Sequence, residues 1–479
     1  MYLKCDSVKK AEPFQLYIDT EIELPEGAEV ISVPVKAWAE APLSKTNEVV
    51  TTLNIEYSVV IATENGIEVL KEHRSEGVRI PFPGLSEGAF SVVKAVIVGS
   101  EYAGDGVLKV RVMAEVNASA IFEEGFEAAE NTGLEVRTEK ITVYSALPIS
   151  VQEIVYSVAA APDADISSVI ASQSIVTIDS VSVATDLLHV SGCITTYIQY
   201  LKDGKINGTT VTKTFEEEVL ASGMTEGGVA EVIPSLAGEV ASSEDGSIRV
   251  EGVLRLTGFC FVPECFSVIS DAYSLTKELS LQFKEAQITE NVCLVTDKSK
   301  FFGSVREESF APYCIAALNA PGISAMNVKG MNPVNIEGVL TAHMTAEDSS
   351  GVPRGVQAEI AFRTECYPSE ECPGSVSVSA EIADYSARLR QGGTIELSGE
   401  IAVRLLSEST RFVRYLASYE ELGDKELPEN PVITLYIAGR EETLFDVAKA
   451  LNADTERLKE LNPELGELSE GDKIIYYDV

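Results

Sequence analysis

Apolar and polar residues alternate along most of this chain. The stretches LNIEYSVVIA from Leu53, HVSGCITTYIQYL from His189 and VNIEGVLTAHMTA from Val334 place an apolar residue at nearly every second position. This period puts one face of a strand against a core and the other in solvent. Each stretch runs into a turn rich in Gly, Asn, Asp or Ser and continues as a second alternating run towards a Phe. The pattern predicts β-hairpins.

Two landmarks recur three times in the same order, which indicates an internal repeat. The first is a turn glycine followed by a phenylalanine: Gly66 and Phe82, Gly204 and Phe215, Gly351 and Phe362. The interval is 16 positions in the first pair and 11 in the others, so a longer hairpin is expected in the first copy. The second is a turn glycine before a further strand: Gly106, Gly246 and Gly393.

A short segment of helical character follows that strand in each copy: EEGFEAAENTG, PECFSVISDAY and STRFVRYLASYEELG. The predicted fold is therefore multidomain and mainly β, with three tandem antiparallel β-rich repeats that each carry a short helix. A small strand–helix–helix–strand domain follows them. The predicted units are repeats at 1–148, 149–300 and 301–421, a linker at 422–431 and a terminal domain at 432–479. The charged, proline-containing linker predicts few contacts between the repeats and the terminal domain.

The terminal segment carries local signals for its own helices. Thr443 and Asp446 form a capping-box pattern at the start of the first helix, and Asn452 tolerates the left-handed geometry that ends it. Asp454 can cap a second helix, which Pro463 prevents from continuing. The alternating runs VITLYIA and DKIIYY predict the two flanking strands.

Charge and composition narrow the possible partners. The 75 acidic and 37 basic residues give a formal net charge of −38, which repels nucleic acid and anionic membranes. The charge fits either a well-solvated surface or an acidic face for a basic partner. The start MYLKCDSVKKAEPF has no apolar signal core, and no uninterrupted run of 18 apolar residues occurs. We therefore expect a cytoplasmic protein without membrane insertion.

The sequence contains little that suggests catalysis. Its eight cysteines have no Cys-x-x-Cys pair, so reduced thiols without a metal or another cofactor are expected. No phosphate-binding glycine loop or nucleophile elbow is present. Ser91 and Lys94 have a β-lactamase-like spacing but lie in an alternating strand, and the three histidines, His73, His189 and His343, lie in predicted strands or hairpins. We expect no catalytic residues and no enzymatic activity.

The terminal segment resembles a LysM domain over its whole length. The residues that carry the resemblance are Tyr436, Thr443-Leu444, Val447-Ala448, Leu458, Leu461-Asn462-Pro463, Leu465, Gly471-Asp472 and Ile474-Ile475. The family usually has Gly-Asp where this chain has Glu441-Glu442. The resemblance implies a shallow groove for N-acetylglucosamine-containing glycans such as peptidoglycan or chitin. Its lining would be Glu441, Glu442, Thr443, Leu444, Phe445, Asn462, Pro463, Glu464 and Leu465.

Some of these residues also have a structural interpretation. Leu444, Leu461 and Pro463 suit core packing or helix termination, whereas Glu441, Glu442 and Glu464 are expected to be exposed. The tandem β repeats followed by one LysM domain are similar to the SPOCS-domain proteins of endospore formers. That resemblance implies a non-enzymatic adaptor made in the mother cell, which acts in spore coat assembly. Its LysM end would dock to the coat basement-layer ATPase SpoIVA. The alternative is a glycan-binding LysM protein of the cell wall or cortex.

Overall fold

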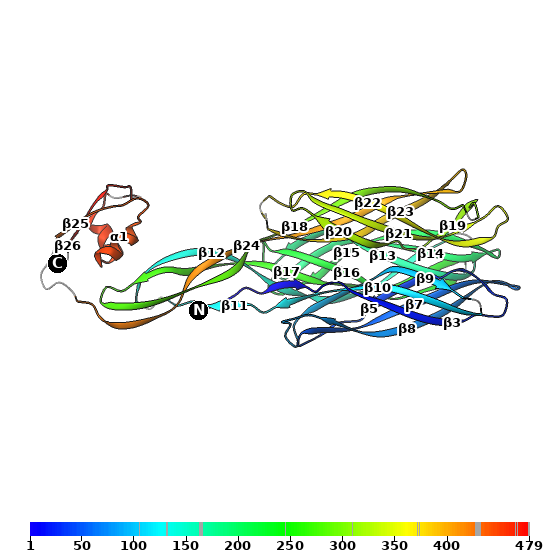
Figure 1. Cartoon of the computed structure of the whole chain (residues 1–479), viewed down its shortest axis with the longest axis horizontal. Helices are drawn as coiled ribbons and strands as arrows, with labels where there is room; N and C mark the ends of the chain where they lie inside the picture. Colours follow the sequence, from blue (N-terminus) through cyan, green and yellow to red (C-terminus); the bar gives the residue numbers. More distant parts are fainter. Residues whose placement is uncertain are drawn as a thin grey trace.

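A computed structural model describes the chain except residues 105, 131–132, 162–165, 245, 309, 371, 373, 427–432, 465, 467 and 478–479. Strands that pair antiparallel make up most of the described part, and the helices found there are two short ones near the C terminus (Figure 1). The mainly β fold expected from the alternating pattern is confirmed. Among the described residues, no helix has both the length and the hydropathy to cross a membrane.

The first repeat forms two sheets, each arranged around a long central strand. The first sheet has β10 (Val107–Phe122) at its centre, between β9 (Ser91–Ala103) on one side and β2 (Ser7–Lys10) and β3 (Phe14–Glu23) on the other. The second has β7 (Glu48–Thr63) at its centre, with β8 (Gly66–Pro81), β4 (Glu29–Ser32), β5 (Val35–Ala39) and β6 (Leu43–Lys45).

The second and third repeats have the same plan of two sheets. In the second repeat the sheets are β12 (Glu135–Ala160), β17 (Ser247–Tyr273) and β16 (Val229–Glu244), and β13 (Ile166–Ala184), β14 (Leu187–Lys202) and β15 (Lys205–Leu220). In the third they are β18 (Lys277–Arg306), β24 (Thr394–Asp424) and β23 (Ser375–Arg390), and β19 (Cys314–Leu318), β20 (Gly322–Lys329), β21 (Val334–Glu347) and β22 (Pro353–Cys366).

Each pair of sheets encloses one apolar core, so each repeat is a β-sandwich. Buried leucines come from both sheets: Leu53 and Leu108 in the first repeat, Leu188 and Leu256 in the second, Leu340 and Leu397 in the third. Burial of such side chains is the main contribution to the stability of each sandwich. The boundaries expected at 148/149 and 300/301 fall within the continuous strands β12 and β18.

The predicted hairpins are present as β7–β8, β14–β15 and β21–β22. Asp203 and Gly204, both with positive φ, form the two-residue turn of the second hairpin. The longer hairpin expected in the first copy is wrong, because β7, β8, β14 and β15 all have 16 residues. Phe82 lies just beyond β8, whereas Phe215 lies within β15 and packs over Gly192 of the opposite strand.

The short helix predicted in each repeat is wrong for the described residues. The first segment forms β11 (Gly125–Glu127), which pairs with β1 (Tyr2–Lys4), and the other two continue strands β17 and β24. Bulges explain the helix-like spacing, because an extra residue shifts which side chains face the core. One lies at Ser270, where the register moves from Arg137–Asp271 to Thr138–Ile269. Shifts also interrupt the β18–β24 ladder.

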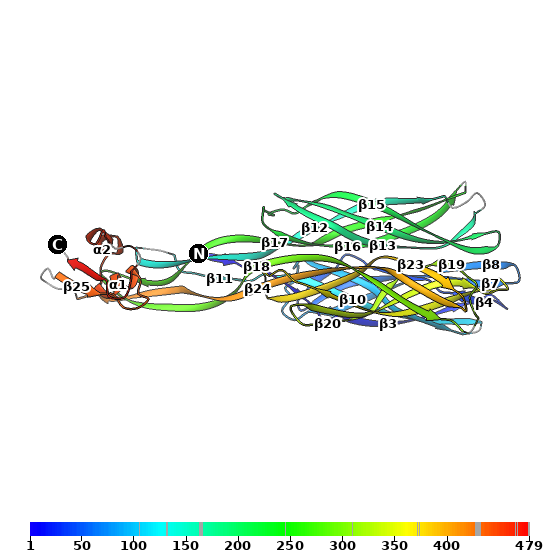
Figure 2. The same ribbon diagram turned by 90° about the horizontal axis from the view of Figure 1, so that it is seen from above.

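The longest strands leave the sandwiches as an arm. Residues 262–273 of β17 continue past β16 and pair with β12, and residues 409–424 of β24 continue past β23 and pair with β18. Strands β1 and β11 lie beside them, and Leu3, Phe126, Val268 and Val413 share a buried cluster there. Figures 1 and 2 show the arm between the sandwiches and the terminal domain.

A buried ion network joins the three repeats. The Arg404 guanidinium of the third repeat lies 3.2 Å from the Glu381 carboxylate and donates a hydrogen bond of 2.7 Å to the Val232 carbonyl of the second. Lys94 of the first repeat, the residue of the Ser91-Lys94 spacing, pairs with the same Glu381 carboxylate. Residues far apart in the sequence therefore hold the sandwiches together. This lysine sits in strand β9, as the alternation predicted.

Candidate binding site in the terminal domain

The terminal domain has the predicted order of strand, helix, helix and strand. Its elements are β25 (Ile433–Ile437), α1 (Leu444–Leu451), α2 (Thr455–Leu461) and β26 (Lys473–Tyr477), with β25 paired to β26. The capping box of Thr443 and Asp446, the left-handed Asn452 and the Asp454 cap are all confirmed. Residues Val447, Ala448, Leu458 and Ile474 are fully buried between the helices and the sheet.

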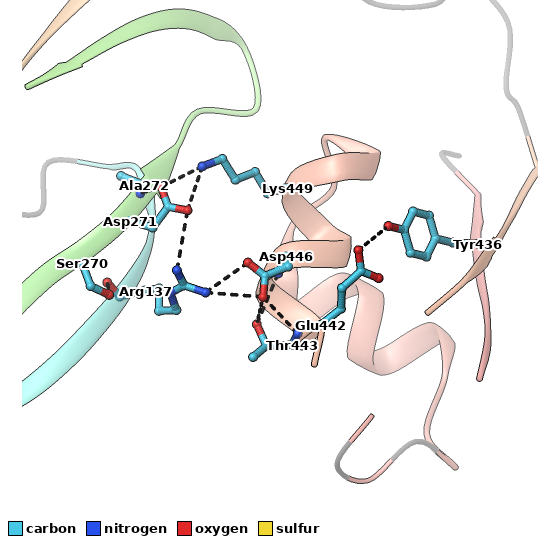
Figure 3. A network of polar contacts seen from close by, with 9 residues as sticks. All are labelled: Arg137, Ser270, Asp271, Ala272, Tyr436, Glu442, Thr443, Asp446 and Lys449. Atoms are coloured by element: carbon cyan, nitrogen blue, oxygen red, sulfur yellow. Dashed lines mark hydrogen bonds and ion pairs between the residues drawn. The ribbon is translucent and has the colours of Figure 1, made fainter. Parts of the chain in front are cut away.

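In the loop before α1, the two glutamates have different roles. The Glu442 carboxylate accepts a hydrogen bond of 2.7 Å from the Gly439 amide and, as Figure 3 shows, one from the Tyr436 hydroxyl, which measures 2.9 Å. The second bond raises the pKa of Tyr436. Glu441 has a φ of 63°, and 86% of its side chain is exposed. The expectation that Glu442 is exposed is therefore wrong, because its carboxylate closes the loop. Glu441 is exposed, as expected, and its carboxylate lies 3.7 Å from the Arg440 guanidinium.

The loop after α2 is held by Asn462. Its side-chain amide donates to the Leu458 and Ile475 carbonyls at 2.8 and 2.7 Å, and its side-chain oxygen accepts from the Ile475 amide at 2.8 Å. Pro463 and Glu464 are exposed, whereas Leu465 lies outside the described residues. Asn462 thus ties this loop to β26, and both ends of its side-chain amide take part in hydrogen bonds that hold the loop.

Both candidate loops rest on the same small sheet. Glu442 is bonded to β25 and Asn462 to β26, but no hydrogen bond or ion pair links the described residues of one loop to those of the other. Leu444 is half-buried in the domain core, and Thr443 uses its hydroxyl in the helix cap. Among the predicted residues that the structure describes, Glu441, Pro463 and Glu464 are exposed and their side chains form no hydrogen bond with other described residues. Glu441 does lie 3.7 Å from Arg440.

Phe445 does not line a groove, because it packs against the arm. The ring of Tyr273, the last residue of β17, meets the Phe445 ring edge-on at 5.3 Å between centroids. The Tyr273 hydroxyl donates a hydrogen bond of 2.7 Å to the Ala453 carbonyl between the two helices. Burial raises the pKa of Tyr273 to about 12. An aromatic residue of this kind buries a large apolar area and uses its hydroxyl as well.

Charged residues surround this aromatic contact. Arg137 of β12 lies 3.0 Å from the Asp446 carboxylate, and Lys449 of α1 lies 2.7 Å from the Asp271 carboxylate of β17 (Figure 3). Partial burial raises the pKa of Asp446, but hydrogen bonds from Thr443 and the charges of Arg137 and Lys449 outweigh that effect and lower it. The cap of α1 is therefore also part of the contact with the arm.

The expectation of few contacts across the linker is wrong. Besides the aromatic and ionic contacts, the Asn452 side chain donates to the Leu275 carbonyl at 2.8 Å. The sequence did not predict the contacts of the arm residues Arg137, Asp271 and Tyr273, because these residues lie more than 170 positions from the helices that they contact. The one signal in the sequence was a large apolar residue, Phe445, in the first turn of a helix whose own core is small.

Cysteine and histidine side chains outside the terminal domain do not gather into a metal site among the described residues. All eight cysteines are free thiols. Across the residues that the structure describes, no group of three or more His, Cys, Asp or Glu side chains is placed to hold a metal. Burial lowers the pKa of His343, whereas the exposed His189 lies 3.6 Å from Glu218.

We predict that Glu441→Gly stabilises the terminal domain by about 0.5–1 kcal/mol. A left-handed backbone costs a residue with a Cβ about 1–2 kcal/mol, and the greater freedom of glycine in the unfolded chain offsets part of this gain. Slower hydrogen exchange of the α1 amides would measure it. The matched change Glu470→Gly, at another exposed glutamate of the same domain, should give no such gain. Faster exchange in Glu441→Gly would contradict the prediction.

Searches for similar proteins returned nothing: no protein-family model, no curated protein and no solved structure matches this chain.

Proposed function

We propose that this chain is a non-enzymatic adaptor of endospore coat assembly. It would dock through its LysM-like terminal domain to a coat basement-layer ATPase resembling SpoIVA, on the mother-cell side of the developing spore and later in the coat. The proposal rests on the resemblance of the tandem repeats and the tail to SPOCS-domain proteins such as SipL. The observation that carries it furthest is the position of the terminal domain, which is fixed at the end of the arm (Figure 2).

The arm supports a docking role in physical terms. Its contacts with Phe445, Asp446 and Lys449 hold the terminal domain by its helices and leave Glu441 and Glu464 exposed. A rigidly held domain loses less conformational freedom on binding than a flexibly tethered one. The sandwiches would then place the docking domain at a fixed distance from whatever binds the repeats.

Charge favours a protein over a glycan as the ligand. A neutral sugar offers no cation for the exposed carboxylates Glu441 and Glu464, and removing them from water without a partner costs binding energy. A protein with Lys or Arg opposite these residues would gain electrostatic steering and specificity. Phe445 is unavailable to any ligand while the domain is docked on the arm.

Glycan binding in the cell wall or cortex remains the second candidate function, and one observation favours it. Glu441 has a positive φ, the geometry that the glycine usual in the LysM family would adopt. Glu442 closes the loop with its carboxylate, as the usual aspartate could. The loop backbone is therefore compatible with the family's groove, and the peptidoglycan ligand can be tested directly.

We predict that the full chain binds a purified SpoIVA-like ATPase more tightly than it binds chito-oligosaccharides. Protein binding should weaken about tenfold or more between low salt and about 1 M salt, where the screening length falls to about 3 Å. Titration calorimetry against both ligands measures this difference.

The double change Glu441→Gln and Glu464→Gln should reduce the salt dependence. The matched control, Glu216→Gln with Glu218→Gln, removes two exposed charges from β15 of the second sandwich and should leave it unaltered. Micromolar binding of the oligosaccharide without any binding of the ATPase would reverse the order of the two candidate functions.

A further inference from the structure

One face of the terminal sheet is apolar and uncovered. Antiparallel pairing places Ile433 opposite Tyr477, Leu435 opposite Ile475 and Ile437 opposite Lys473, so all six side chains project from the same face. The exposed fractions of its apolar members are Ile433 79%, Leu435 57%, Ile437 61%, Ile475 46% and Tyr477 39%. We call these five residues the terminal sheet face.

The other face of the same sheet is already used. Tyr436, Ile474 and Tyr476 pack in the domain core with α1 and α2. The helices in turn contact the arm through Phe445, so α1 lies between the arm and the sheet (Figure 3). The contacts with the arm therefore do not cover the terminal sheet face. They hold it at the far end of the molecule (Figure 1).

Five neighbouring apolar side chains on two short strands are unusual for a free surface. Alternating strands normally present polar residues to water, and contiguous exposed apolar patches mark interaction sites. Here the outward positions of β25 are the apolar Ile433, Leu435 and Ile437, whereas one of its inward positions is the polar Thr434. Burial of this face against a partner would explain why its outward positions carry apolar side chains.

The net charge selects among possible occupants. Two copies of a chain with a formal charge of −38 repel each other, and an anionic membrane or a nucleic acid is repelled in the same way. A partner with basic residues around its apolar surface would be attracted to the acidic chain, whereas a second copy would have to overcome this repulsion.

We propose that the terminal sheet face is the docking surface for a partner protein whose apolar strand or helix is surrounded by Lys and Arg residues. The apolar residues would cover Leu435, Ile437 and Ile475, and the basic rim would meet the acidic terminal domain, which has ten Asp or Glu and five Lys or Arg between 433 and 477. Lys473 places one positive charge at the end of the face, where a single carboxylate of the partner can pair with it.

The inference rests on the proposed function, because it takes the coat ATPase as the partner to be tested. The two proposals differ in which surface of the terminal domain supplies most of the binding affinity. The loops with Glu441 and Glu464 would steer and orient the partner, whereas the terminal sheet face would supply the buried apolar centre of the interface.

The test uses the full chain and the purified ATPase in an immobilised binding assay. Leu435→Arg should weaken binding about 30-fold or more, as expected when a central apolar contact is lost and a charge is buried in its place. Leu220→Arg is the matched control, because Leu220 is a leucine of 64% exposure on the second sandwich. It should change the affinity less than about threefold.

Because Leu435 points into solvent, Leu435→Arg should keep the wild-type melting temperature and α1 hydrogen exchange. If the wild type binds and Leu435→Arg binds equally well, the face is wrong while the proposed function stands. If the wild type does not bind the ATPase, both fail. A wild-type dimer in sedimentation that Leu435→Arg dissociates would assign the face to a second copy and overturn the proposal.

Discussion

Replacing Tyr273 by alanine should release the terminal domain from the arm. The change removes an edge-on ring contact with Phe445 and the hydrogen bond to the Ala453 carbonyl, both at a buried position. Truncating a buried aromatic residue typically costs about 3–5 kcal/mol. The ion pairs Arg137–Asp446 and Lys449–Asp271 are partly exposed and contribute too little to hold the domain by themselves.

Hydrogen exchange followed by mass spectrometry can measure the release. In Tyr273→Ala, exchange should accelerate in α1 and at the tip of the arm, residues 269–276, while the sandwiches keep their protection. Tyr273→Phe removes only the hydroxyl bond and should give a smaller effect, about 1 kcal/mol. Tyr17→Ala is the matched control, because Tyr17 is 65% exposed on β3. Unchanged exchange in α1 of Tyr273→Ala would show that the docking contact is unimportant.

The second large effect is expected at the junction of the three repeats. Glu381→Gln keeps the shape of the side chain but leaves Lys94 and Arg404 without their shared carboxylate. Arg404 is only 9% exposed, so its charge cannot be solvated well. Breaking a buried ion pair on one side costs about 3–5 kcal/mol. A lower thermal unfolding midpoint would record this loss.

Two controls test whether the loss of stability comes from leaving buried charges without a partner. Glu396→Gln breaks a partly exposed pair, in which Glu396 lies 2.8 Å from Arg390, and should cost no more than about 1 kcal/mol. The triple change Lys94→Met, Glu381→Leu and Arg404→Met replaces the whole network with apolar groups and should be much milder than Glu381→Gln alone. Equal midpoints for wild type and Glu381→Gln would mean that the network does not stabilise the junction.

The effect of Glu381 should also depend on pH. Burial alone raises the pKa of Glu381, but the charges of Lys94 and Arg404 outweigh it and lower the pKa below its ordinary value of 4.5. A carboxyl group with a lowered pKa stabilises the fold above its unfolded pKa and loses that contribution as the pH falls through the folded one. The difference between wild type and Glu381→Gln should therefore be full near neutral pH and shrink below about pH 4.5.

Local signals in the sequence predicted the local structure correctly. The turn at Asp203-Gly204, the capping box of Thr443 and Asp446 and the left-handed end at Asn452 each involve residues within a few positions of one another. Their geometry is set by backbone sterics and hydrogen bonds that neighbours in the chain can complete. The alternation of apolar residues predicted the hairpins for the same reason, because the side-chain period of a strand is local.

Structural features that depend on residues far apart in the sequence could not be predicted from local patterns. The segment PECFSVISDAY has apolar residues at helix-like intervals, but pairing with β12 and a bulge at Ser270 make it a strand. For the candidate site, the sequence placed the two loops beside α1 and α2, where the structure has them, and assigned Phe445 and Asn462 to ligand binding. Packing of Phe445 on Tyr273 and bonding of Asn462 to Ile475 give these residues structural roles.

The sequence by itself determined the strand-rich repeats, their turns and the two capped helices of the terminal domain, because each follows from periodicity or from contacts within a few residues. Only the tertiary structure decided the arm, the junction at Glu381 and the docking of the terminal domain on Tyr273. The strands of the arm pair residues that are more than 100 positions apart, Tyr273 and Ala453 are 180 positions apart, and Lys94 and Glu381 are 287 apart. Such partners are chosen by the packing of whole sheets, which no local pattern encodes.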